Sequence, residues 1–156
     1  MATSSFYRIR KKEKNFEFAN TVVTIASIFN IFGSAYGIFS YVYNLLEYHH
    51  QTQHLSEEVI GGLTEFLDGR FLVAYSVRLI LGILIFTFSV RNFFLLKNGK
   101  PVSNTQSVLG VVYILAVIFT DVSFGWNFYG LIFPSFYSAI YFLSYLTASQ
   151  VNQLND

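Results

Sequence analysis

Two side chains of opposite charge, Arg78 and Asp121, lie inside long apolar stretches of the sequence, where a charge can carry chemistry. A lone charge at membrane depth costs several kcal/mol, so it needs a partner or a function. Counting about 1.5 Å per helical residue, Arg78 lies roughly 10 Å and Asp121 roughly 5 Å from the outer ends of their stretches. An extended arginine spans that difference. The pair could form an outer gate, an ion-coupled switch or an anion site. A structural ion pair or an outward-extended arginine is favoured, because a lone pair makes a poor transport pathway.

Three histidines, His49, His50 and His54, lie together in one predicted loop. On a helix, His50, His54 and Glu58 would share a face, because they repeat at intervals of four residues. Imidazole and carboxylate ligands suit zinc, so these three residues are a possible metal site. The spacing matches no specific zinc signature, which favours a solvated surface instead.

Small and polar residues repeat along the first apolar stretch. Ala26, Asn30 and Ser34 follow one another at intervals of four, and Gly33 and Gly37 form a G-x-x-x-G pattern. Small residues at this spacing let two helix backbones approach closely in a membrane. We therefore predict helix packing at Asn30, Gly33 and Gly37, inside the bundle or against another protein.

Aromatic residues repeat every four positions in the last apolar stretch, at Tyr129, Phe133, Tyr137, Tyr141 and Tyr145. A step of four overshoots a helical turn by about 40°, so the rings form a ridge that winds round the helix. Buried tyrosine hydroxyls need partners, and nearby serines or Asn30 can supply them. Helix packing is favoured over a polar path along this ridge.

These residues must be positioned by helices. The composition is 53% hydrophobic and only 12% charged, against about 25% charged residues in a typical soluble domain. Residues 20–46, 71–96, 106–125 and 127–148 are each apolar and long enough to cross a hydrocarbon core of about 30 Å. The prediction is all-α: a single domain, residues 1–156, folded as an integral-membrane four-helix transmembrane bundle.

Basic residues predict its orientation, because Lys and Arg are enriched in short cytoplasmic loops. Residues 1–19 carry five of them and the 97–105 loop two, whereas the 47–70 loop carries only Arg70. Both termini, including the tail 149–156, and the 97–105 loop are therefore expected in the cytoplasm, in a bacterial-type plasma membrane. Arg91, close to the cytoplasmic end of its stretch, is interpreted as an interfacial anchor.

The 47–70 loop is predicted to contain a short amphipathic helix on the outer surface. Its apolar residues fall at helical spacing, and Ser56 and Gly69 are suited to its two ends. The apolar residues are Val59, Ile60, Leu63, Phe66 and Leu67.

Several function classes lack their residues. There is no cysteine, no histidine pair for haem within the spans, and no H-E-x-x-H, phosphate-loop or G-x-S-x-G motif. No catalytic residue, enzyme activity or cofactor is predicted. The basic tail is explained by anionic lipid headgroups, so no nucleic-acid partner is expected.

The expected function is association in the bilayer, as an accessory subunit or a homo-oligomer, with a protein partner or a second copy. The alternative is a small transporter or channel with Arg78 and Asp121 as its outer gate. A membrane enzyme would need a metal at His50, His54 and Glu58.

Overall fold

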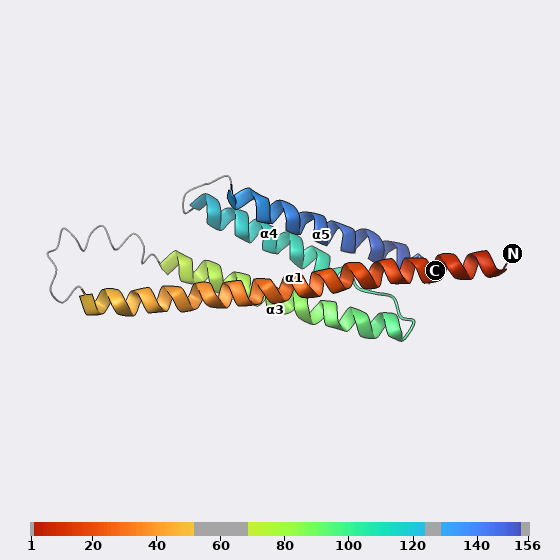
Figure 1. The fold of residues 1–156 in the computed structure, drawn as a ribbon, viewed down its shortest axis with the longest axis horizontal. Coiled ribbons are helices and arrows are strands. Elements are labelled where there is room, and N and C mark those ends of the chain that lie inside the picture. The colour runs from red at the N-terminus through yellow and green to blue at the C-terminus, as the bar shows by residue number, and fades with distance from the viewer. Residues whose placement is uncertain (1, 52–68, 124–128, 154–156) are drawn as a thin grey trace.

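The fold consists of long antiparallel helices. A computed structural model describes residues 2–51, 69–123 and 129–153. Four helices make up this part of the chain: α1 (Ala2–Gln51), α3 (Gly69–Lys97), α4 (Thr105–Ser123) and α5 (Tyr129–Asn152) (Figure 1). Successive helices reverse direction, so α1 begins and α5 ends at the same end of the bundle, together with the 98–104 connection. We call this the terminal end and the opposite one the distal end.

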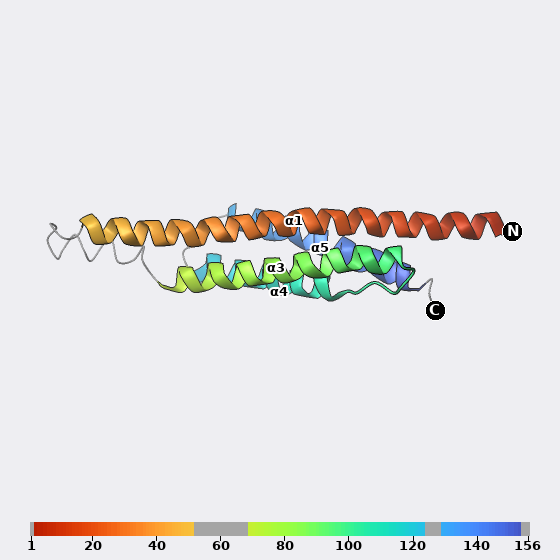
Figure 2. The ribbon, with the colours of Figure 1, turned by 90° about the horizontal axis from the view of Figure 1, so that it is seen from below.

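The helices pack as a ring in which α1 contacts α3, α3 contacts α4, α4 contacts α5, and α5 returns to α1 (Figures 1 and 2). The main apolar core joins all four helices at Val23, Ala26, Ile85, Tyr113, Ile114, Ile140 and Tyr141. A smaller cluster near the terminal end contains Phe16, Val102, Ala148 and Val151. The all-helical prediction is therefore confirmed, and each predicted apolar stretch contributes one helix.

The first helix is much longer than its apolar stretch. The sequence predicted a span at 20–46 after a basic tail, but α1 is a single helix of 50 residues that includes the basic segment. At about 1.5 Å per residue it is roughly 75 Å long, against roughly 36 Å for the 24 residues of α5. Figure 1 shows α1 projecting past the other helices at the terminal end.

A glycine motif ends α3. Gly99 has a φ of 62°, the left-handed conformation that glycine adopts without a Cβ penalty. The N–H of Gly99 donates to the carbonyl of Leu96 at 3.0 Å, and the N–H of Lys100 to that of Leu95 at 2.9 Å. These two bonds form a Schellman motif, which satisfies carbonyls at the helix end and turns the chain toward α4.

Most of the apolar surface faces outward. Two helical segments, Ile9–Tyr48 and Gly69–Lys97, are long and apolar enough to cross a membrane, and a shorter apolar helix covers Thr105–Thr120. Only 28% and 17% of the most apolar windows of the two long segments are buried. The predicted amphipathic helix of the 47–70 loop lies almost wholly outside the described residues.

Candidate functional site

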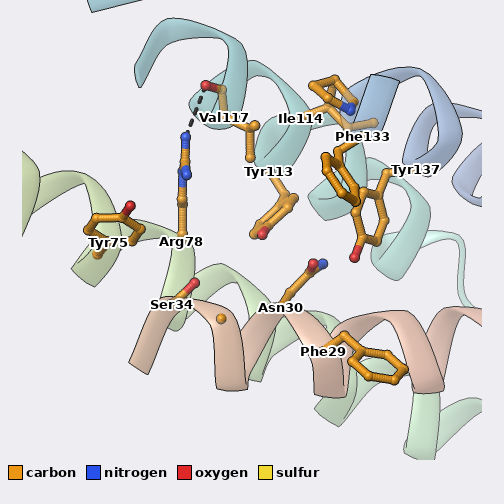
Figure 3. Close-up of a pocket in the computed structure, with 12 residues that line it drawn as sticks. Phe29, Asn30, Ser34, Tyr75, Arg78, Tyr113, Ile114, Val117, Phe133 and Tyr137 are labelled. Carbon is orange, nitrogen blue, oxygen red and sulfur yellow. Dashed lines mark hydrogen bonds between the residues drawn. The ribbon is translucent and has the colours of Figure 1, made fainter. Parts of the chain in front are cut away.

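A cavity of about 360 Å³ lies between all four helices, in the distal half of the bundle (Figure 3). Its polar lining consists of Asn30, Ser34, Tyr75, Arg78, Tyr113 and Tyr137. Its remaining walls are Phe29, Gly33, Ile114, Val117, Phe133 and Pro134. We call this half of the bundle the open half. A cavity of this size, mostly apolar with a few convergent polar groups, has the usual character of a small-molecule site.

Arg78 is the charged residue of this cavity. It extends from α3 toward α4, where its Nη2 donates to the carbonyl of Val117 at 3.0 Å. The guanidinium carbon also lies 5.6 Å from the centre of the Tyr75 ring. A cation at this distance from an aromatic face is attracted to it, and the attraction strengthens away from water. The arginine is thereby held half-buried between two helices.

The predicted partner of Arg78 is placed only by its backbone. Asp121 belongs to α4, one helical turn beyond Val117, so its backbone lies at the right level for a pair with Arg78. Its side chain lies outside the described part of the structure. The Arg78–Asp121 ion pair therefore stays a prediction.

The small-residue face of α1 is turned into the bundle. Ala26, Asn30 and Ser34 are all buried, and Asn30 Nδ2 donates to Tyr141 Oη across the α1–α5 contact at 3.5 Å. The two glycines have different surroundings. A Cβ on Gly37 would collide with the Tyr75 ring, whereas a Cβ on Gly33 would have no atom within 4 Å.

The aromatic ridge of α5 winds between environments. Tyr141 is buried, stacks on the half-buried Tyr137, and closes on Gly110 of α4. Phe133 and Tyr145, at the two sides of this pair, are exposed. The ridge thus fills the centre of the bundle and leaves it at both ends.

The possible zinc site is not described as a group. His50 is exposed at the last turn of α1, and His54 and Glu58 lie outside the described residues. In the described ranges, no three His, Asp or Glu side chains come together as metal ligands.

The half of the bundle next to the terminal end is closed by buried amides and hydroxyls, which sequence reasoning missed. Asn20 Nδ2 donates to the carbonyl of Ser89 at 2.9 Å, and the Ser89 hydroxyl donates back to Asn20 Oδ1 at 3.1 Å. The amide of Asn92 exchanges two bonds of 2.8 Å with the backbone of Ser103. We call this the closed half.

Two further contacts complete the closed half. Asn152 exchanges two bonds of 2.9 Å with the backbone of Val102, and Gln106 Nε2 donates to Ser144 Oγ at 2.8 Å. Gln106 Oε1 has no hydrogen-bond partner among the described residues. The sequence signal was present, because these amides interrupt or flank apolar stretches, where unpaired polar groups are costly.

The second missed feature is an apolar stripe along the outer face of α1, which we call the association stripe. Its members alternate at spacings of four and three: Phe18, Val22, Ile25, Phe29, Phe32, Tyr36, Phe39, Tyr43 and Leu46. Eight of them are 49–71% exposed, and Val22 is partly buried. The average spacing of 3.5 residues is the repeat of coiled coils. The signal was the spacing itself, which the small-residue pattern of the same helix obscured.

In comparisons with known proteins, no family model matches this chain, no curated protein matches it, and no solved structure matches its fold. The function is therefore argued from the geometry alone.

Proposed function

We propose that this chain is a small multi-pass membrane protein that acts by helix–helix association, and that the association stripe of α1 is its contact surface. No catalytic step is part of the proposal. The observation that carries it is the combination of an exposed, evenly spaced stripe with a helix longer than the bundle it belongs to.

Low burial supports a membrane environment. A soluble bundle turns the apolar face of each helix inward and covers the outside with polar residues. Here large rings face outward on several helices, with Phe32 70%, Phe119 75% and Phe136 64% exposed. Exposed apolar surface on this scale is stable in hydrocarbon and prone to aggregation in water.

The arrangement of charge supports an orientation with both termini in the cytoplasm of a bacterial-type cell. The basic segment of α1, which includes Arg8 and Lys14, and the connection with Lys97 and Lys100 lie at the terminal end. Basic residues are retained on the cytoplasmic side and attracted by anionic lipids. The chain has no cysteine, so single cysteines at Lys100 and Gln53 can report the two sides. Labelling of Lys100→Cys, but not Gln53→Cys, from outside intact cells would reverse this orientation.

The spacing of the stripe supports a helix as its partner. Lipid tails require an apolar surface but no particular spacing, whereas a second helix requires a repeat near 3.5 residues. The stripe positions are uniformly bulky, while exposed positions beside the stripe include Thr21, Gly33 and Ala35. The small-residue face is already occupied within the bundle, which leaves the stripe for association.

A second copy is the simplest partner. Copies with the same topology lie parallel in the membrane, so each stripe residue of one copy would meet the same residue of the other. Single cysteines at Phe32 and Phe39 should therefore form cross-linked dimers in native membranes. A cysteine at Val42, which is exposed but off the stripe, is the matched control.

Dimers from Phe32→Cys and Phe39→Cys, with little from Val42→Cys, are the expected result. A cross-linked product larger than the dimer, at the same two positions, would identify an accessory-subunit role instead. Equal cross-linking at all three positions, or none at any, would rule out the stripe as a contact surface.

The second candidate function is transport through the bundle, supported by the single cation placed between four helices at Arg78. Flux into proteoliposomes that disappears in Arg78→Gln and persists in Arg91→Gln would favour it. Arg91 is a suitable control because it is basic, exposed and on the same helix.

A further inference from the structure

We propose that the cavity around Arg78 binds one amphiphilic monoanion, with its headgroup at Arg78 and its apolar tail leaving between α1 and α5. The headgroup chemistry is a carboxylate or a phosphodiester, each with two oxygens that share one negative charge. This inference concerns ligand binding and does not depend on association or on transport.

The size and lining of the cavity match a headgroup with the start of a tail. A volume of about 360 Å³ lies near the lower end of the range of small-molecule sites, about 300–1,000 Å³. Figure 3 shows Asn30, Tyr113 and Tyr137 pointing into the same space as Arg78. Amide and hydroxyl groups donate hydrogen bonds to anionic oxygens, while the aromatic and aliphatic walls suit a hydrocarbon chain.

The charge of the cavity selects an anion. Arg78 is the one formally charged side chain among the twelve lining residues. Its bond to the Val117 carbonyl satisfies a donor but brings no negative charge. A guanidinium at this depth gains from an anion because the surroundings screen charge poorly. One cation matches one negative charge, which favours a monoanion over a phosphate monoester.

The cavity opens sideways. Phe29 of α1 and Phe133 of α5 line it and are each 68% exposed, so their rings stand at its edge. Beside them, Gly33 has open space where a side chain would begin. In a membrane this opening faces lipid tails, and an amphiphile can enter from the bilayer without crossing water.

Binding of tritiated laurate to the full chain in phosphatidylcholine nanodiscs tests the inference. We expect saturable binding of one laurate per chain, with dodecanol, which has the same tail without a charge, at least tenfold weaker as a competitor. The expected factor follows from losing hydrogen bonds to a charged group, about 1.5–3 kcal/mol. Dodecyltrimethylammonium should not compete.

Phosphatidylglycerol in the same discs distinguishes the two sources of the headgroup. Displacement of laurate by phosphatidylglycerol identifies a phospholipid as the occupant. Displacement only by other fatty acids identifies a free carboxylate. Either result supports an amphiphilic monoanion at Arg78.

Two variants with matched controls locate the site. Arg78→Gln should weaken laurate binding about tenfold or more, while Arg91→Gln should leave it unchanged. Gly33→Leu should block the cavity mouth, whereas Gly69→Leu, at another open glycine outside the lining, should have no effect. If Arg78→Gln does not fold, the pair of glycine variants decides.

Three results would overturn the inference. Laurate that fails to bind saturably would indicate a cavity that holds only water. Dodecanol that competes as well as laurate would exclude recognition of charge. Wild-type binding in Gly33→Leu, with Arg78→Gln also unaffected or unfolded, would place any bound laurate elsewhere.

Discussion

The two halves of the bundle are built from the same four helices but are held together in different ways. In the closed half, amide side chains such as Asn20 and Asn92 bond to backbone groups of a neighbouring segment, and they are fully buried. In the open half, Arg78 and a set of rings surround a cavity. The contact between α1 and α5 there begins with one long bond, from Asn30 to Tyr141.

This difference has a physical reason. A short amide places a donor and an acceptor against one peptide group, which draws two helices together and excludes water. A long guanidinium and several phenol rings reach across a wider gap, because their polar atoms stand far from the backbone. The closed half is therefore suited to fix the arrangement of the helices, and the open half to receive a ligand.

The largest expected effect is the loss of one amide in the closed half. Asn92→Leu removes both bonds to Ser103 and leaves a buried N–H and a buried carbonyl without partners. We expect a loss of about 2–4 kcal/mol in the free energy of unfolding, since each orphaned group costs about 1–3 kcal/mol. Titration with sodium dodecyl sulfate in mixed micelles measures it. Asn98→Leu, at an exposed position, is the control, and an equal loss in both would refute the distinction between the halves.

The next effect tests the boundary between the halves. A Cβ on Gly110 would overlap the ring of Tyr141, which is only 1% exposed and has little room to move. Gly110→Ala should therefore cost about 1–3 kcal/mol of unfolding free energy, the usual range for overpacking a core. The same titration measures it. An unchanged stability would mean that the α4–α5 contact is looser than the structure indicates.

In the open half, the corresponding glycine substitution should act in the opposite direction. Gly33→Ala meets no atom within 4 Å and reduces the backbone freedom of the unfolded chain. We expect a gain of about 0.5–1 kcal/mol in helix stability. A loss of stability would show that the space beside Gly33 is filled, and would also count against the cavity.

The smallest effect is expected at the bond between α1 and α5. Asn30→Leu removes a hydrogen bond whose atoms are 3.5 Å apart, at the limit of useful geometry. Interhelical hydrogen bonds in membranes contribute about 0.6 kcal/mol on average, so a loss of this size or less is expected. A loss as large as that of Asn92→Leu would mean that the open half is held as firmly as the closed half.

Much of the fold could be predicted from local sequence. The apolar stretches predict the helices because backbone hydrogen bonds within a helix need no partner elsewhere in the chain. Gly99 and Pro101 mark the end of α3 because their backbone preferences are local. The start of α1 could not be read in this way, since the basic segment has no apolar pattern and continues a helix that begins at Ala2.

The candidate site was predictable only in part. Arg78 and Asn30 stood out because polar side chains in apolar stretches need partners. Their partners were not readable, because the carbonyl of Val117 and the hydroxyl of Tyr141 become neighbours only once the helices are in register. The cavity has no sequence signal of its own, since residues from four separate helices line it.

By itself, the sequence determined the helices, their alternating direction and the faces that carry small or bulky residues, because all of these follow from composition and helical spacing. Only the tertiary structure decided that one half is closed and the other open. Gly33 and Gly37 illustrate the reason. They are one helical turn apart in the same motif, but one faces open space and the other a tyrosine ring. What a residue contacts depends on the helix opposite, and that is a property of packing.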